Sequence, residues 1–204
     1  MAKDEMKLYN ELKNLRGKDR YWDKGMQAEL MEKAFPKDVS ALVLGMSYVA
    51  SEFYGYMLMQ IGEKFGWDKV DSVSKAVFHQ LGKEKTKAAI DGGLDLPRDT
   101  RALALVLAST VYSSNPEFNF EVKEYAPEQT VIRIFGTSRY SRIAKKVGIE
   151  KHLSWPVLVP FFEGIADQIG IECECNTETN VMGEDGKCDY LARFTLSGRK
   201  YGDD

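Results

Sequence analysis

Histidine, cysteine and proline are scarce in this sequence. Its 204 residues include two histidines, three cysteines and six prolines. The three cysteines make an odd number, and the charged amino-terminal stretch has no apolar core of the kind that signal peptides carry. We therefore expect reduced thiols and a cytoplasmic location, not a framework of disulfides.

Long apolar runs and an excess of charge are missing as well. The longest mostly apolar stretch, 39–59, is interrupted by Ser40, Ser47, Ser51 and Glu52. We therefore expect a helix of the protein core there and not a membrane span. The net charge is −3, whereas broad nucleic-acid binding needs a basic surface. The sequence thus predicts neither a membrane nor a nucleic acid as a partner.

The signatures of several common enzyme classes are absent too. The chain has no Walker loop, no GxGxxG after a strand, no HExxH and no GxSxG. Each of these motifs places specific groups around a phosphate, a dinucleotide, a zinc ion or a serine nucleophile. Each absence weakens the case for one common enzyme class; the cofactor stays unknown, and no metal-binding residues are predicted from these motifs.

Helical periodicity dominates the first half of the chain. Apolar residues recur at helical spacing over 1–16, 24–34, 69–91 and 98–113. A longer helix is expected over 38–65, apolar on nearly every side, which is typical of a central and buried helix. Gly45, Gly55 and Gly62 lie inside it, where each costs about 1 kcal/mol relative to alanine. We expect another helix, or a ligand, to approach closely at these glycines.

Strand periodicity appears after residue 116. Apolar and polar residues alternate over 118–123, a return strand is expected over 131–135, and a second hairpin over 171–179 and 188–196. Two helices, 138–147 and 155–169, separate the hairpins. We predict a single α+β domain over 1–204: a helical part, about 1–115, packed on an antiparallel sheet of about four strands, about 116–198.

The cysteines allow three interpretations. Cys173 and Cys175 are two residues apart on a strand, so their side chains share a face. Cys188 lies on a mostly apolar face of the next strand, and the three sulfurs meet if both faces turn inward. In the first interpretation the three cysteines are buried thiols that act as small hydrophobes. In the second they form part of a metal site that lacks a nearby histidine. In the third one of them is a reactive thiol.

Acid–base chemistry has few candidate residues. His79 lies on a half-buried helix, whereas His152 lies in a connection between helices and is the better general base. Glu163 and Asp167 share a helix face and either face solvent or share a proton or a cation. Glu52 is the isolated charge in the apolar helix and needs a partner.

The carboxy-terminal part resembles a known family. Its segments are FFEGIADQIG at 161–170, CNTETNVMG at 175–183 and DGKCDY at 185–190. They resemble the L-2-amino-thiazoline-4-carboxylic acid hydrolase-like family over about 118–196. Ser138 and Ser154 stand where members of that family often carry cysteine. The layout is also similar to that of the 4-vinyl-reductase-like domains, which are small-ligand modules.

The first resemblance implies a hydrolase that cleaves a C–N bond of a small cyclic amidine or amide-like substrate. His152 or Glu163 would activate water, and Cys188 would shape the pocket or act as a thiol. Arg139 would hold a substrate carboxylate through its planar fork. Further substrate contacts are expected from Ser138, Ser154, Trp155, Tyr54, Glu52 and Tyr190.

The second resemblance implies a non-catalytic module. Aromatic side chains, frequent in the helical half, would then line a cavity for a small apolar ligand, although core packing also accounts for them. A third interpretation is that the apolar helices form the interface of a homo-oligomer. The three interpretations require different structures. A hydrolase needs clustered polar groups in a cleft, a ligand-binding module needs a closed apolar cavity, and a homo-oligomer needs a flat apolar surface.

Overall fold

The computed structural model describes residues 8, 10–12, 15, 18–183 and 185–199. The chain divides into two compact units, Met1–Ser47 and Tyr48–Asp204. The division falls inside the long helix α3, Val39–Phe65. Each unit is described by itself.

The first unit contains helix α2, Lys24–Lys33. Asp23 caps this helix, because its Oδ1 accepts a hydrogen bond of 2.8 Å from the backbone N–H of Met26. Asp38 acts in the same way where α3 begins, accepting from Ala41 at 2.7 Å. The helix expected over 24–34 is confirmed, and the helix expected over 1–16 lies largely outside the described residues.

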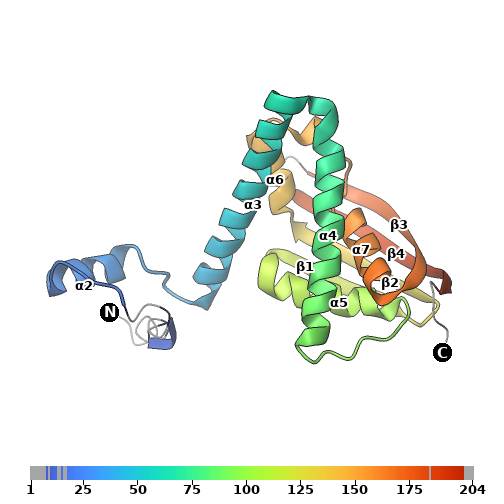
Figure 1. Cartoon of the computed structure of the whole chain (residues 1–204), viewed down its shortest axis with the longest axis horizontal. Coiled ribbons are helices and arrows are strands. Elements are labelled where there is room, and N and C mark those ends of the chain that lie inside the picture. Colours follow the sequence, from blue (N-terminus) through green and yellow to red (C-terminus); the bar gives the residue numbers. More distant parts are fainter. Residues whose placement is uncertain (1–7, 9, 13–14, 16–17, 184, 200–204) are drawn as a thin grey trace. The chain divides into compact units, whose positions relative to one another are not determined.

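The second unit contains the rest of α3 and the remaining helices (Figure 1). These are η1 (Trp67–Lys69), α4 (Val70–Asp91), α5 (Arg101–Ser114), α6 (Arg139–Lys146), η2 (Glu150–His152) and α7 (Val159–Ile169). The helices expected over 69–91, 98–113 and 138–147 are confirmed. Among the helices of the described residues, none combines the length and apolar character that crossing a membrane requires.

Helix α7 begins four residues later than the sequence predicts, at Val159 in place of Trp155. Trp155 precedes Pro156, and a residue before proline is disfavoured in helical backbone. Pro160 instead lies in the first turn of α7, where its missing N–H costs nothing.

Four strands form one antiparallel sheet in the order β1-β2-β4-β3. They are β1 (Phe118–Tyr125), β2 (Gln129–Thr137), β3 (Ile171–Met182) and β4 (Lys187–Arg199). The two hairpins therefore join through β2 and β4, with Ile134 opposite Tyr190 and Ile132 opposite Ala192. The predicted α+β fold with a four-stranded antiparallel sheet is confirmed.

The core of the second unit lies between this sheet and its helices. Ile132, Ile134 and Phe194 are fully buried on the inner face of the sheet, which α5 and α7 cover, and α4 packs on α7 (Figure 1). The outer face carries charged residues among a few apolar ones: Arg133 pairs with Asp189 at 2.6 Å, and Val131 lies on the same side. This alternation along the strands is why the sequence pattern located the sheet.

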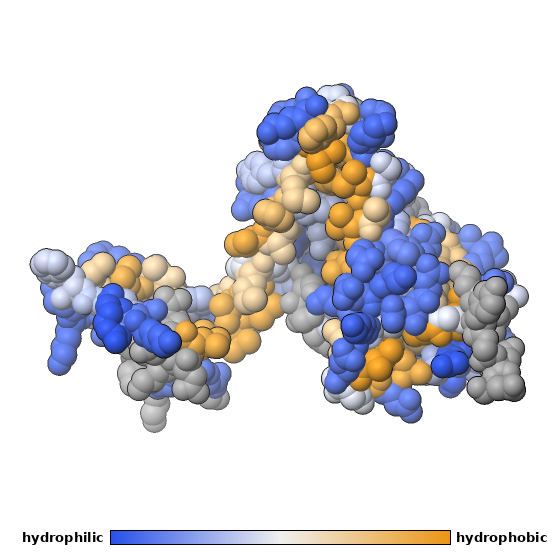
Figure 2. Space-filling view, viewed as in Figure 1, coloured by the Kyte–Doolittle hydropathy of each residue, from blue (hydrophilic) through white to orange (hydrophobic). Residues whose placement is uncertain are grey.

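Helix α3 is buried on one side only, so the prediction of a helix buried all round is wrong. Tyr54 and Leu58 are buried, whereas Val49 and Phe53 are each 69% exposed. Figure 2 shows apolar side chains along the visible side of α3. Apolar side chains make burial of the helix favourable. Burial on every side also needs other helices or strands to cover each side, and the composition of α3 does not provide those.

Two of the three glycines of α3 mark close approaches. A β-carbon at Gly55 would overlap the side chain of Ile143 on α6, and one at Gly62 would overlap the ring of Trp67. Gly45 has no neighbour within 4 Å of such a carbon. The lack of a side chain at Gly55 thus lets α6 lie directly against α3, and this contact positions the site described next.

Candidate functional site

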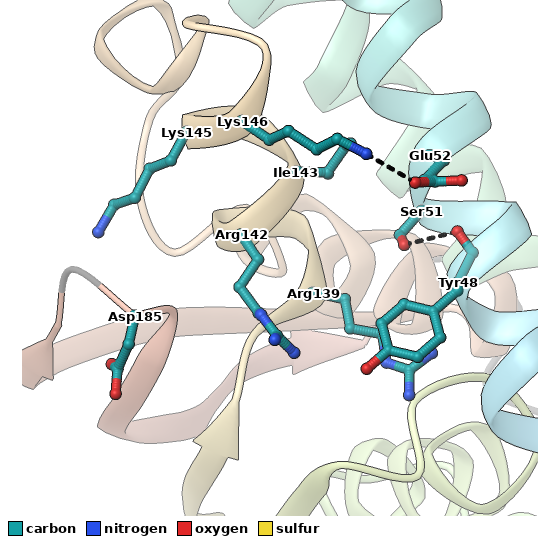
Figure 3. A pocket seen from close by; sticks show the side chains of 9 residues that line it. All are labelled: Tyr48, Ser51, Glu52, Arg139, Arg142, Ile143, Lys145, Lys146 and Asp185. Atoms are coloured by element: carbon teal, nitrogen blue, oxygen red, sulfur yellow. Dashed lines mark hydrogen bonds and ion pairs between the residues drawn. The ribbon is translucent and has the colours of Figure 1, made fainter. Parts of the chain in front are cut away.

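A pocket of about 500 Å³ lies between α3 and α6 (Figure 3). We call it the α6 pocket. Its lining residues come from α3, from α6 and from the turn between β3 and β4: Tyr48, Ser51, Glu52, Arg139, Arg142, Ile143, Lys145, Lys146 and Asp185.

Helix α6 supplies a basic face. Its cations recur three or four residues apart, so they project from one side of this short helix; they are Arg139, Arg142, Lys145 and Lys146. The helix begins at Ser138, whose Oγ accepts from the N–H of Ser141 at 3.2 Å. The backbone N–H of Ser138 donates to Gly186 at 2.8 Å, which ties the start of α6 to the β3–β4 turn.

Arg139 is the buried member of this face, only 2% exposed. Its Nε donates to Oε2 of Glu117 at 2.7 Å. Its guanidinium carbon lies 4.1 Å from the centroid of the Tyr48 ring, within the range of a cation–π interaction. These two contacts fix the plane of the guanidinium beside the pocket.

Arg142 and Lys145 carry positive charge toward solvent. Nη1 of Arg142 is 3.7 Å from Oε1 of Glu117, and its side chain is 46% exposed. Its stem packs on Gly186, where φ is +84° and a β-carbon would overlap it. Lys145 donates to the carbonyl oxygen of Gly183 at 2.7 Å, a contact that orients its ammonium without neutralising it.

Two carboxylates offset part of this charge. Glu52 pairs with Lys146 at 2.9 Å, and hydrogen bonding to Glu52 raises the pKa of Lys146. Asp185 pairs with Lys187 at 2.8 Å. Four cationic and two anionic side chains line the pocket, so an excess of positive charge remains even when Glu117 is included. This arrangement suits an anion.

A second cavity, of about 540 Å³, lies between α4 and the segment that leads into α7. We call it the α4–α7 cleft. Its walls are partly apolar and its rim is polar; the lining residues are Asp71, Ser74, Lys75, Ala76, His79, Ser154, Trp155, Pro156, Val157, Val159, Pro160 and Glu163.

The polar groups of the cleft are mostly engaged with one another. Asp71 accepts from the N–H and the Oγ of Ser154 at 2.6 and 3.0 Å and pairs with Lys75 at 2.7 Å. Partial burial raises the pKa of Asp71, but these contacts outweigh it and hold the pKa below its usual value. His79 Nε2 lies 2.9 Å from Oδ2 of Asp167.

The residues expected to bind substrate are divided between the two cavities and the core. Glu52 and Arg139 line the α6 pocket, and Ser154 and Trp155 line the α4–α7 cleft. Ser138 is buried at the start of α6.

Two further residues of that set, both tyrosines, belong to the core. The hydroxyl of Tyr54 makes a 2.8 Å hydrogen bond with Ser74, and burial raises the pKa of Tyr54. Tyr190 is buried on the inner face of the sheet, and burial raises its pKa as well.

The three residues expected to be catalytic line no common cavity. Glu163 lies in the α4–α7 cleft, whereas the ring of His152 stacks on Trp67 at 4.7 Å between centroids. Cys188 is buried on β4, where burial raises the pKa of its thiol to about 11. The sheet register also separates the sulfurs, because Cys188 lies opposite Met182 and Cys175 opposite Phe194. Among the described residues no three potential metal ligands cluster.

Sequence reasoning missed most of the cations of the α6 pocket. Arg142, Lys145 and Lys146 follow Arg139 at helical spacing, and this pattern alone indicates a basic face. His79, which we ranked below His152, is the histidine that lines a cavity. The partners from α3, Tyr48 and Ser51, are identified only by the contact between the two helices.

Comparisons with known proteins bear on the fold. No family model and no curated protein matches the sequence. A crystal structure of trafficking protein particle complex subunit 3 from Naegleria fowleri, covalently bound to palmitic acid, is similar at a TM-score of 0.50. The match covers 76% of this chain and 98% of the other, at 11% identity. At that identity the likeness shows the fold alone.

Proposed function

We propose that the second unit is a binding module for a small anionic molecule, held in the α6 pocket. The observation that carries this proposal is the basic face of α6, which lines a cavity with a buried and oriented arginine, Arg139. A cation that is already desolvated and fixed loses little freedom when a ligand arrives. Surface lysines without such a cavity would not support the same inference.

A carboxylate or a phosphate fits the geometry. The guanidinium of an arginine presents parallel N–H groups that match two oxygens of either anion, and Arg142 stands beside Arg139 in the pocket (Figure 3). Tyr48 and Ile143 add an apolar wall. The ligand we expect therefore has one anionic group and a small apolar part.

The structural relative holds a fatty acid through a covalent bond. Of the described residues that line the α6 pocket, none is a cysteine and most are charged. The lining therefore supports a ligand held without a covalent bond, in which the charged group contributes most of the affinity.

Isothermal titration calorimetry on the full chain tests this proposal, with inorganic phosphate, glycerol 3-phosphate, citrate and a short-chain fatty acid as probes. We expect at least one probe to bind, and Arg142→Gln to weaken that binding about tenfold or more. Arg193→Gln is the matched control, an exposed arginine of β4 outside the pocket. Binding of no probe, or equal losses in both variants, contradicts the proposal.

A hydrolase is the second candidate function, and the α4–α7 cleft is the observation that favours it. Glu163, Ser154 and Trp155 line this cleft together, as a substrate site would require. His79, oriented by Asp167, lines it as well. Glu163 would act as general base toward water, and the cleft would hold a small cyclic amidine or amide-like substrate.

A hydrolysis screen of thiazolines and cyclic amidines tests this second candidate. Activity that Glu163→Gln and His79→Ala abolish, and that His152→Ala leaves intact, supports a reaction in the cleft. Activity that persists in all three variants assigns the reaction to a different site, and absence of turnover removes the candidate.

We also propose a cytoplasmic location. All three cysteines are free thiols, and a reducing compartment keeps thiols in that state. Fractionation of the host cells, followed by detection of the protein in the soluble cytoplasmic fraction, tests this location. Recovery with secreted proteins contradicts it.

A further inference from the structure

Two cysteines lie side by side on one face of an edge strand. β3 is the outermost strand in the order β1-β2-β4-β3, and Cys173 and Cys175 are two residues apart on it. Their side chains therefore share the face of the sheet that α7 covers (Figure 1). Both are partly buried, whereas Cys188 is buried. Of the described residues that line the α6 pocket and the α4–α7 cleft, none is a cysteine, so the functions proposed above leave this pair unused.

The two thiols contact each other. The side chain of Cys175 makes a hydrogen bond with that of Cys173. Each sulfur also lies near a backbone carbonyl: Sγ of Cys175 is 4.0 Å from the oxygen of Cys173, and Sγ of Cys173 is 3.7 Å from that of Glu174. The pair is thus a cluster of two thiols at hydrogen-bonding distance, and not two separate cysteines.

The surroundings give the two thiols different properties. The hydrogen bond between them lowers the pKa of Cys173, and the same bond together with burial raises the pKa of Cys175. The negative charges of Glu163 on α7 and of Glu174 raise the pKa of Cys175 further. Cys173 is therefore the thiol that ionises first and attacks as a nucleophile, while Cys175 keeps its proton beside it.

The backbone allows the two sulfurs to join. Residues two apart on a strand are separated by about 6.4–6.8 Å, and the Cα atoms of a disulfide can be up to about 6.8 Å apart. The pairing of β3 with β4 changes register between Glu172 and Cys173, so the ladder is already interrupted next to the pair. Cys188 lies opposite Met182, seven residues along β3 from Cys175, and cannot compete for either thiol.

We propose that Cys173 and Cys175 form a redox dithiol, which a hydroperoxide oxidises to a disulfide. The Cys173 thiolate attacks the terminal oxygen of the hydroperoxide, the O–O bond breaks, and the alkoxide leaves as an alcohol after taking a proton from water. The sulfenic acid formed on Cys173 is then attacked by the sulfur of Cys175. The S–O bond breaks, and the hydroxide leaves as water with the proton of Cys175. Two thiols and one hydroperoxide thus give one disulfide, one alcohol and one water.

The disulfide would be readily reversible. Its two Cα atoms lie near the upper limit of disulfide geometry, and strain of this kind makes the bond easier to reduce. Two molecules of a small thiol would restore the dithiol by exchange and leave as their own disulfide. The inference needs neither the anion bound in the α6 pocket nor a reaction in the α4–α7 cleft.

Peptide mapping of the full chain after treatment with a few equivalents of hydrogen peroxide tests this proposal. Between Lys151 and Lys187 the sequence has no lysine or arginine, so trypsin releases Cys173 and Cys175 in one peptide and Cys188 in the next. We expect the peptide 152–187 to lose two hydrogen atoms and to resist alkylation, whereas Cys188 is still alkylated once the protein is unfolded. Dithiothreitol should restore both thiols.

Single substitutions separate the two roles. Cys175→Ser leaves the sulfenic acid of Cys173 without a resolving thiol, so labelling of Cys173 by dimedone should rise about tenfold over the wild type. Cys173→Ser should slow oxidation of Cys175 by about tenfold or more, because the remaining thiol stays protonated. Both positions are partly exposed, and circular dichroism should remain that of the wild type. Cys188→Ala is the matched control and should form the disulfide like the wild type.

Four results would overturn the proposal. The first is that both thiols remain free after peroxide treatment, and the second is that the disulfide links two chains instead of two residues of one peptide. The third is a lack of dimedone labelling at Cys173 in Cys175→Ser. The fourth is an equal rate of disulfide formation in the folded chain and in the chain unfolded in urea, which would show that the fold does not prepare the pair.

Discussion

The guanidinium of Arg139 lies over the ring of Tyr48, with 4.1 Å between the guanidinium carbon and the ring centroid. Tyr48 belongs to α3 and Arg139 to α6, and Glu117, just before β1, accepts a hydrogen bond from the same arginine. One buried cation thus connects three segments that are far apart in the sequence. The α6 pocket depends on this connection, because it holds α6 in place beside α3.

Arg139→Met should destabilise the protein by about 2 kcal/mol, since it removes the hydrogen-bonded partner of the partly buried Glu117 carboxylate and leaves only Arg142, 3.7 Å away. Arg139→Lys should lose less, because lysine keeps the charge but not the planar stacking on Tyr48. Urea denaturation followed by circular dichroism measures both. Arg193→Met, at an exposed position, should change stability by less than about 0.5 kcal/mol. Equal stability of Arg139→Met and wild type would show that the ion pair does not hold α6.

Glu52→Gln should strengthen binding of an anion in the α6 pocket by about three- to tenfold. The substitution removes one of the two carboxylates that line the pocket and releases Lys146 from its ion pair, so the field at the site becomes more positive. Calorimetry with the probe that binds best to the wild type measures the change. Glu63→Gln alters a glutamate of the same helix outside the pocket and should have no effect. Weaker binding in Glu52→Gln would show that the carboxylate contacts the ligand.

The sheet and most helices follow from the sequence because each element has its own periodicity. Alternation in β2 and β4 places Ile132, Ile134 and Phe194 on one face, and that face is the one that is buried. Only local chemistry is needed for such an inference, and the pattern repeats over enough residues to define the element.

The site does not follow from the sequence to the same extent, because it depends on contacts between distant segments. The basic face of α6 is visible in the sequence, but the ring of Tyr48 and the close approach at Gly55 are not. The exposure of one side of α3 could not be predicted from the sequence either. The apolar pattern of a helix is the same whether or not the rest of its own chain covers that side. Cys188 and Cys175 lie on neighbouring strands, and only the register separates them.

Gly82→Ala and Gly164→Ala should each destabilise the protein by about 2–3 kcal/mol. A β-carbon at Gly82 would overlap the carbonyl oxygen of Phe161, and one at Gly164 would overlap that of His79, so neither backbone can yield without separating α4 from α7. Because both substitutions force the same separation, the double variant should lose less than the sum of the two. Thermal denaturation measures these differences.

Gly45→Ala is the control for the glycine variants. Apart from the neighbouring backbone of α3 itself, no atom lies within 4 Å of a β-carbon there, so the substitution should be neutral or should stabilise by up to about 1 kcal/mol through helix propensity. Equal losses at Gly82 and Gly45 would contradict the close packing of α4 on α7.

Cys173 should react with iodoacetamide faster than either Cys175 or Cys188. Cys175 donates a hydrogen bond that lowers the pKa of Cys173, and the same bond together with burial raises the pKa of Cys175. Burial raises the pKa of Cys188 to about 11, and its side chain is 4% exposed. The thiolate is the reacting form, so at pH 8 about one Cys188 in a thousand is reactive.

The rate of labelling should depend on pH differently for Cys188 and for Cys173. Labelling of Cys188 should rise about tenfold per pH unit up to pH 11, whereas labelling of Cys173 should level off at a lower pH because its pKa is lowered. Cys175→Ser weakens the hydrogen bond to Cys173 and should slow labelling of Cys173 near pH 7. Tandem mass spectrometry of digested samples distinguishes the sites, and protein unfolded in urea supplies the reference rates. If Cys188 and Cys173 are labelled at the same rate in the folded protein, Cys188 is not buried on the inner face of β4 as described.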